Sequence, residues 1–233
     1  MIEPISIRLE ASSHCQLRCP ACPTTDGSID QVIGKSFLKA DDFRTFLERN
    51  PSVRNIELSN YGEIFLNPQL LEILKIARER NVALAALNGV NLNSVTDEVL
   101  EAIVKYRFRE MTCSIDGASA ETYRVYRVRG NFDRVTANVA KINQWKVTYR
   151  SRYPLLQWQF VVFRYNEHEL PKARAMAQEL GMHFAPKLSW TDTGALANAE
   201  MVRGETGAAS RAEFEERFGR DYAQAICHQL WDR

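Results

Sequence analysis

The chain has 233 residues, of which 45% carry hydrophobic side chains, and its 30 Lys and Arg residues nearly balance its 29 Asp and Glu residues. A chain of this length can bury a core without disulfides or oligomerisation. The net charge of +1 lacks the basic excess of a general nucleic-acid binder, and no apolar run in the sequence is long enough to cross a membrane.

The termini and the cysteines indicate the compartment. Residues 1–5 form neither the basic region nor the apolar core of a targeting signal. Three of the five cysteines, Cys15, Cys19 and Cys22, lie within eight residues, whereas a secreted disulfide framework spreads an even number along the chain. We therefore expect a cytoplasmic protein that binds a metal through clustered thiols.

Apolar runs of strand length alternate with helical patterns, as in repeated strand-helix units around a parallel sheet. Six strands are expected, near residues 5–11, 55–59, 83–87, 110–115, 156–163 and 183–188. Sequential parallel strands with right-handed crossovers curl toward a barrel, but a closed eightfold barrel needs about 250 residues. The sequence therefore predicts an α/β fold, an incomplete (β/α)6 TIM-like barrel.

Helix signals lie between these strands. Asn67 followed by Pro68, Thr96 and Asn131 are each expected to cap the N-terminus of a helix. Pro171 is expected to open a further helix, which Gly181 ends.

The composition changes after the sixth strand. Residues 191–210 are rich in glycine and small side chains, and an amphipathic helix is expected near 211–226. We predict a partial barrel over 1–190, a linker over 191–210 and a C-terminal helical stub over 211–233. Cys227 and Trp231 lie in the last seven residues, and the sequence offers no further segment for them to pack against. We therefore expect the natural protein to continue beyond Arg233.

The strongest chemical signal is the loop Cys15-Gln-Leu-Arg-Cys19-Pro-Ala-Cys22. Thiolates hold iron-sulfur clusters, and three ligands at this spacing can reach three corners of one cubane. The fourth iron would remain open to a chelating molecule. A zinc site is the alternative, although structural zinc usually takes two ligand pairs separated by a longer loop, and His14 adjoins Cys15 too closely to serve easily as a fourth ligand.

The loop and the strand-helix alternation resemble the radical S-adenosylmethionine (radical SAM) superfamily. After the second strand, Tyr61-Gly62-Glu63 is similar to the family's Gly-Gly-Glu segment, with Tyr61 in place of the first glycine. After the third strand, Asn88-Gly89 resembles the Thr-Asn-Gly corner.

A further stretch after the fourth strand, Ser114-Ile-Asp116-Gly117 followed by Arg127, is similar to the Ser-x-Asp-Gly stretch of peptide-modifying members. The resemblance implies a [4Fe-4S] cluster on the three cysteines and bound S-adenosylmethionine. It implies that the ammonium lies at Gly62 and Glu63, the carboxylate at Arg127 and the ribose at Ser114 or Asp116, and we expect the adenine against Val162 and Leu188. The expected cofactor contacts are thus Tyr61, Gly62, Glu63, Ser114, Asp116, Arg127 and Leu188.

Simpler interpretations exist for several of these residues. Gly62-Glu63 and the Ser-x-Asp-Gly corner are both compatible with ordinary turns. Arg127 lies near Arg124, Arg129 and Arg134 and would also suit a solvated basic face. Cys113, inside an apolar strand, is expected to be a core thiol rather than a ligand.

Two departures from the family pattern qualify the resemblance. Ala21 stands where many members place an aromatic residue that packs on the adenine. Cys227-His-Gln-Leu-Trp231 looks like the opening of a SPASM-type extension, of which only the first cysteine is present. We therefore expect a SPASM-type member truncated at the start of that extension.

The resemblance implies an enzyme that forms a 5′-deoxyadenosyl radical and abstracts hydrogen from its substrate, with no catalytic acid or base assigned. A peptide is the favoured substrate, for crosslinking, thioether formation or epimerisation. The alternatives are oxidation or epimerisation of a sugar or other small molecule, and a non-catalytic iron-sulfur or zinc binding fragment. A low-potential donor such as flavodoxin or ferredoxin is the expected partner, and neither nucleic acid nor a membrane is expected.

Overall fold

The protein forms one six-stranded parallel sheet in the order β1-β2-β3-β4-β5-β6, so strands that follow each other in sequence are also neighbours in the sheet. The structure is a computed structural model that describes residues 3–189, 196–220 and 222. The predicted α/β architecture of six sequential parallel strands is confirmed. The strands are β1 (Ser6–Arg8), β2 (Asn55–Glu57), β3 (Ala83–Val90), β4 (Glu110–Ser114), β5 (Leu155–Val162) and β6 (His183–Leu188).

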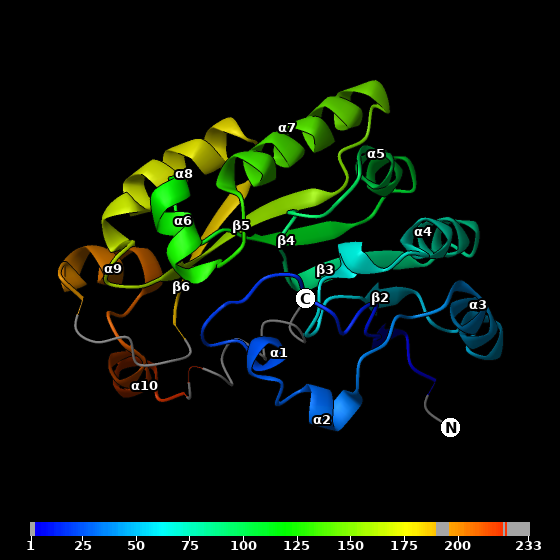
Figure 1. Cartoon of the computed structure of the whole chain (residues 1–233), viewed down its shortest axis with the longest axis horizontal. Helices are drawn as coiled ribbons and strands as arrows, with labels where there is room; N and C mark the ends of the chain where they lie inside the picture. The colour runs from blue at the N-terminus through cyan, green and yellow to red at the C-terminus, as the bar shows by residue number, and fades with distance from the viewer. Residues whose placement is uncertain (1–2, 190–195, 221, 223–233) are drawn as a thin grey trace.

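Helices occupy every connection between the strands. Figure 1 shows α3, α4, α5, α7 and α8 in an arc along one side of the sheet, whereas α1 and α2 lie on the other side. The helices are α1 (Pro23–Asp26), α2 (Asp30–Ile33), α3 (Ala40–Arg49), η1 (Ile64–Leu66), α4 (Leu70–Glu79), α5 (Asp97–Lys105), α6 (Ala120–Tyr126), α7 (Phe132–Thr148), η2 (Glu167–Glu169), α8 (Leu170–Glu179), α9 (Ala199–Thr206) and α10 (Arg211–Phe218).

The sheet face that meets the arc of helices is apolar. Residues aligned across parallel strands share a face, and one such row carries Cys113, Trp158 and Phe184. Arg174 of α8 lies over the Phe184 ring at 5.0 Å, which places this row against the helices. Cys113 is fully buried in this core, in agreement with its prediction as a core thiol.

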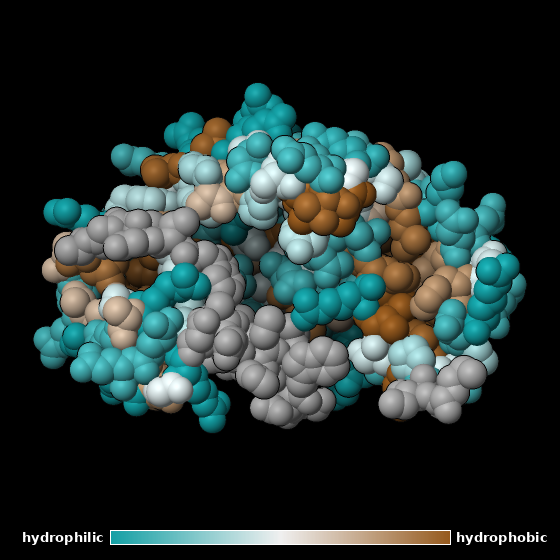
Figure 2. Space-filling view, turned by 90° about the horizontal axis from the view of Figure 1, so that it is seen from below, coloured by the Kyte–Doolittle hydropathy of each residue, from teal (hydrophilic) through white to brown (hydrophobic). Residues whose placement is uncertain are grey.

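The opposite face of the sheet, called the inner face here, carries polar side chains. Glu57, Thr112, Ser114 and Gln159 belong to the alternate rows and are all buried. Viewed from below the orientation of Figure 1, the molecular surface is largely hydrophilic, with apolar areas at the right, at the upper centre and at the left (Figure 2).

Helix starts follow the predicted caps in two of three places. Thr96 and Asn131 accept hydrogen bonds from the backbone of Val99 and Arg134, as predicted for N-caps. Asn67 lies three residues before α4, which begins at Leu70 after Gln69, and its Oδ1 accepts from the Gln69 backbone N–H at 2.7 Å in the turn that leads into the helix. Its Nδ2 also donates to the carbonyls of Ala11 and Leu38 and thereby ties three segments together.

The α8 helix begins at Leu170 with Pro171 in its first turn, and Gly181 follows its end with φ 63°, in agreement with both signals.

The chain after β6 differs from its predicted organisation. The segment expected to be a linker contains α9, whose Val202 is fully buried. Of the helix expected near 211–226, α10 covers Arg211–Phe218 and is followed by Gly219 with φ 60°, and residues 221 and 223–226 lie outside the described residues. The SPASM-like residues 227–231 lie outside the described residues. Among the described residues, no helix is long and apolar enough to cross a membrane.

Candidate functional site

The three clustered cysteines lie on the loop that follows β1, with free thiols in all three. Cys19 is buried, and Cys15 and Cys22 are partly buried. The Cys22 backbone N–H donates to the Cys19 carbonyl at 3.2 Å, and Cys22 is the N-cap residue directly before α1. This loop, residues 15–22, is called the cysteine loop below.

Burial dominates the electrostatics of these thiols. Burial raises the pKa of Cys15 to about 12 and also raises the pKa of Cys19, where the charge of Arg127 opposes it. Among the described residues, no three His, Cys, Asp or Glu side chains converge as ligands of one metal ion. A cubane takes each thiolate at a separate iron, so its ligands do not need to converge on one point.

The loop after β2 packs directly on the start of the cysteine loop. The Glu63 backbone N–H donates to the His14 carbonyl at 2.7 Å. A Cβ at Gly62 would lie 1.9 Å from the Ser12 carbonyl oxygen, so only glycine permits this approach. Thr24, just beyond the cysteine loop, donates from Oγ1 to the Tyr61 carbonyl at 2.8 Å. The structure therefore brings the predicted residues 61–63 together with the cysteine loop.

Glu10 is a member of this site that the sequence motifs did not reveal. Its carboxylate accepts from the backbone N–H groups of Gly62 at 2.9 Å and of Tyr61. Burial raises the pKa of Glu10. Its position two residues beyond β1, in a row of otherwise apolar or small residues, is the only signal in the sequence that pointed to it.

The Glu63 carboxylate lies inside the protein rather than on its surface. Its side chain accepts from the backbone N–H of Phe65 at 3.2 Å and of Asn91 at 2.6 Å. Burial raises the pKa of Glu63 to about 7. Both contacts are to backbone donors, so Glu63 links the loop after β2 to the loop after β3.

Arg127 and Asp116 form a buried ion pair beside the cysteine loop. The Arg127 Nε donates to Asp116 Oδ2 at 2.6 Å, and its Nη1 donates to the Cys19 sulfur at 3.7 Å. Burial opposes the charge of Arg127, but the facing Asp116 carboxylate holds its pKa above the usual value. The alternative of a solvated basic face does not describe Arg127, whose side chain is only 14% exposed.

Asp116 is held by the protein on both oxygens. Its Oδ1 accepts from the Val161 backbone N–H at 2.7 Å, in addition to the bond from Arg127 at Oδ2. The side chain is fully buried. This placement makes Asp116 an anchor for Arg127 and leaves Ser114 as the better placed of the two residues predicted at the ribose.

Ser114 ends β4 on the inner face and meets the last residues of β3. Asn88 and Gly89, expected in a corner after the third strand, lie within β3, where its register with β4 shifts between Ala86 and Val90. A Cβ at Gly89 would lie 2.3 Å from the Ser114 Oγ, and Gly89 has φ 122°. This irregular part of β3 therefore needs glycine both for its backbone conformation and for the approach of Ser114.

Leu188 and Val162 lie away from this group. They are partners in the register between β5 and β6 and belong to the same apolar face as Trp158 and Phe184. Both are buried in the core. Their side chains accordingly pack toward the helices, because alternate residues of a strand face opposite sides of the sheet.

A cavity of about 610 Å³ borders the cysteine loop on the side of α6 and the end of β5. Its aromatic side chains contact one another: the Tyr126 and Phe163 rings are tilted and 4.7 Å apart, and the Phe163 and Tyr165 rings are stacked and 5.3 Å apart. The lining residues are Pro20, Ala21, Val125, Tyr126, Phe163, Arg164 and Tyr165. The sequence analysis did not predict this cavity, and noted only that Ala21 stands where many members of the family place an aromatic residue.

No protein-family model matches the chain. Over 181 residues the chain is 27% identical to the AdoMet-dependent heme synthase of Methanosarcina barkeri, a match that covers 76% of this chain. The chain spans about half the length of this curated relative, 48%.

Among solved structures, the chain is similar to SuiB of Streptococcus suis, with a TM-score of 0.65 and 13% identity over 83% of this chain and 42% of SuiB. SuiB has also been solved bound to S-adenosylmethionine and to its precursor peptide SuiA. Methylornithine synthase PylB matches with a TM-score of 0.56 and 14% identity, over 79% of this chain and 52% of PylB. These matches show a shared fold, and together with the sequence similarity they support the resemblance of this chain to the radical SAM superfamily.

Proposed function

We propose that this protein is a radical SAM enzyme, whose [4Fe-4S] cluster is held by Cys15, Cys19 and Cys22. The observation that carries this proposal is the arrangement of three free thiols on one loop, between the Gly62-Glu63 segment and the Arg127-Asp116 pair. The similarity to an AdoMet-dependent heme synthase and the fold shared with SuiB, which binds S-adenosylmethionine, support it.

The donor set fits the cluster. Three thiolates are the soft ligands that iron-sulfur clusters take, and N–H donors to the sulfur of a ligand stabilise its negative charge. Arg127 is such a donor to Cys19. A single tetrahedral zinc ion fits less well, because it needs converging ligands.

With S-adenosylmethionine and one electron, a cluster of this kind supplies a 5′-deoxyadenosyl radical that abstracts hydrogen from a substrate. The protein's part is to bind and orient the cofactor and to exclude water. We assign the ammonium to the backbone at Tyr61 and Gly62 with the Glu63 charge nearby. We assign the carboxylate to Arg127, because its guanidinium has five donors and its bonds to Asp116 and Cys19 engage only Nε and Nη1.

We assign the ribose to Ser114 and the adenine to the aromatic cavity beside Ala21. The side chains of Tyr126, Phe163 and Tyr165 offer the flat apolar surface that an adenine ring needs. These side chains would thereby take over the packing on the adenine that, in many family members, an aromatic residue at the position of Ala21 provides. This assignment takes the place of the expected contact with Val162 and Leu188.

The substrate is proposed to be a peptide, modified by crosslinking, thioether formation or epimerisation. SuiB, which shares the fold, binds a precursor peptide, and this similarity supports the choice of a peptide. Oxidation of a small molecule is the second candidate, favoured by the similarity to a heme synthase. In either case a low-potential donor such as flavodoxin or ferredoxin would supply the electron, in a cytoplasm that keeps the thiols reduced.

Anaerobic reconstitution with iron and sulfide, followed by dithionite and S-adenosylmethionine, tests the proposal. We expect 5′-deoxyadenosine in the wild type and none in Cys19→Ala. Cys113→Ala is the matched control, because this buried thiol belongs to the core, and it should retain the product. Tight zinc binding without 5′-deoxyadenosine in the wild type would favour the non-catalytic alternative.

A second experiment separates the two substrate classes. The reconstituted enzyme is incubated with a peptide encoded beside its gene and, separately, with precursors of heme. Deuterium transfer from a labelled substrate into 5′-deoxyadenosine identifies the molecule that loses hydrogen. Transfer only from the small molecule would overturn the peptide assignment and leave the enzyme class in place.

A further inference from the structure

Asn91, in the loop after β3, lies at the centre of a buried hydrogen-bond network that reaches the cysteine loop. The residue is only 5% exposed. Its Nδ2 donates to the Cys15 sulfur, with the two atoms 3.9 Å apart, and its backbone N–H donates to Glu63 at 2.6 Å. Asn91 therefore contacts one proposed cluster ligand directly and the proposed ammonium site through Glu63.

The orientation of the Asn91 amide is fixed by the groups around its oxygen. Its Oδ1 accepts from Gln16 Nε2 at 2.7 Å and from the backbone and side-chain nitrogens of Asn93 at 3.0 and 3.3 Å. The Asn93 backbone N–H can only donate, so a flipped Asn91 amide would place Nδ2 against this donor. Nδ2 therefore faces the Cys15 sulfur and the Gln16 Oε1, to which it also donates at 3.5 Å.

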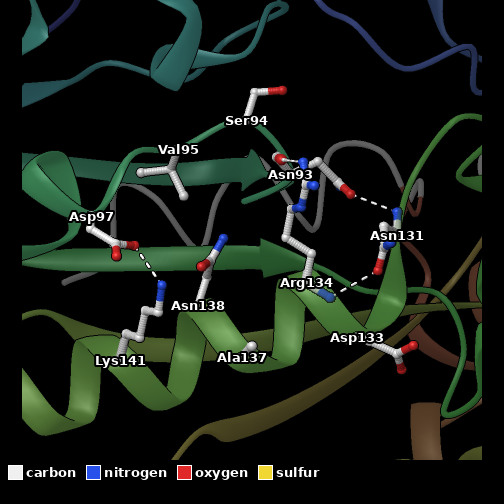
Figure 3. A pocket seen from close by; sticks show the side chains of 10 residues that line it. All are labelled: Asn93, Ser94, Val95, Asp97, Asn131, Asp133, Arg134, Ala137, Asn138 and Lys141. Atoms are coloured by element: carbon white, nitrogen blue, oxygen red, sulfur yellow. Dashed lines mark hydrogen bonds and ion pairs between the residues drawn. The ribbon is translucent and has the colours of Figure 1, made fainter.

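Asn93, which donates to Asn91, is itself fixed by hydrogen bonds to other segments. It is buried, its Nδ2 also donates to the Tyr123 hydroxyl at 3.0 Å, and its Oδ1 accepts from the Asn131 backbone N–H at 2.6 Å. Figure 3 shows Asn93 at the edge of a polar pocket, close to Asn131 and Arg134 at the start of α7. The start of α7 is thereby connected to Cys15 through two asparagines.

We propose that Asn91 is a positioning residue that aims an N–H donor at the Cys15 sulfur and so tunes the cluster, with Asn93 as the residue that fixes its orientation. This inference rests on the proposed function. Hydrogen bonds to the sulfur ligands are one of the determinants of the reduction potential of an iron-sulfur cluster. A donor stabilises the more negative reduced state, so it raises the potential.

The experiment measures the reduction potential of the reconstituted cluster by dye titration followed by electron paramagnetic resonance. Asn91→Ala removes the donor. Asn91→Asp keeps the acceptor toward Gln16 and Asn93 but turns a carboxylate oxygen toward the sulfur. We expect both potentials to be more negative than that of the wild type, with the larger shift in Asn91→Asp. A tenfold change in the one-electron equilibrium would appear as about 59 mV.

Asn138→Ala is the matched control, because Asn138 is buried nearby and donates to the Leu92 carbonyl rather than to a sulfur. It should lower the melting temperature of the apoprotein and leave the potential unchanged. Iron-loaded Asn91 variants with the potential of the wild type would overturn the inference, as would an equal shift in Asn138→Ala. If Asn91→Ala does not fold, the nearly isosteric Asn91→Asp decides the question. A wild type that holds no cluster would instead refute the proposed function itself.

Discussion

Gly62 offers a test of the contact between the loop after β2 and the cysteine loop. In Gly62→Ala, the added Cβ would lie 1.9 Å from the Ser12 carbonyl oxygen and 2.8 Å from the His14 carbonyl oxygen. Both obstacles are backbone atoms, so the two loops must separate for the methyl group to fit. Overpacking of this kind costs about 1–3 kcal/mol, and sometimes more where the backbone must move. In a chain of 233 residues this corresponds to a melting temperature lowered by roughly 2–12 °C.

Differential scanning calorimetry of the apoprotein measures this change without a cluster. Gly204→Ala is the matched control, because Gly204 lies within α9 and an added methyl group there would meet no other atom within 4 Å. That variant should gain about 0.5–1 kcal/mol, since alanine is the better helix former. After reconstitution, Gly62→Ala should also bind less iron than the wild type. Equal melting temperatures for Gly62→Ala and the wild type would refute the close packing of the two loops.

Three further predictions concern the ion pair, the aromatic cavity and a partly buried lysine. Asp116→Asn should lose roughly 3–5 kcal/mol in urea unfolding, because Arg127 would keep a buried charge without its counter-ion; a loss below about 1 kcal/mol would contradict the pair. Tyr126→Ala should weaken S-adenosylmethionine binding about 2- to 13-fold in calorimetry, whereas the exposed Val147→Ala should not change it. Burial lowers the pKa of Lys187 to about 8, from 10.5, so the unfolded chain binds more protons between these pH values. The unfolding free energy of the wild type should therefore rise relative to that of Lys187→Met by about 2 kcal/mol from pH 8 to pH 10, and a flat difference would contradict the burial of this amine.

The fold was predictable because its signals are local. Thr96 and Asn131 cap helices at the predicted positions, and alternating apolar runs sufficed to place the six strands. Asn67 shows the limit of such signals. Its Oδ1 makes the local contact with the Gln69 backbone N–H, but its Nδ2 bonds to Ala11 and Leu38, which are distant in sequence, and no local signal predicts those two bonds.

The candidate site was predictable only in part, for the same reason. The motifs around the cysteines, Gly62 and Arg127 indicated residues that the structure brings together. Glu10 and Asn91 act through contacts with segments more than 50 residues away, and their own neighbours in sequence carry no motif that reveals this. The register of β6 explains the placement of Leu188, because one position along a strand decides which face a side chain joins.

The central claim is that Cys15, Cys19 and Cys22 hold three irons of a cubane and leave the fourth open to S-adenosylmethionine. Mössbauer spectroscopy of protein reconstituted with iron-57 tests it most directly, by comparing spectra with and without S-adenosylmethionine. The account predicts four irons per chain, of which one alone changes its spectrum when the cofactor is added. A cluster whose four irons are all insensitive to S-adenosylmethionine would contradict it.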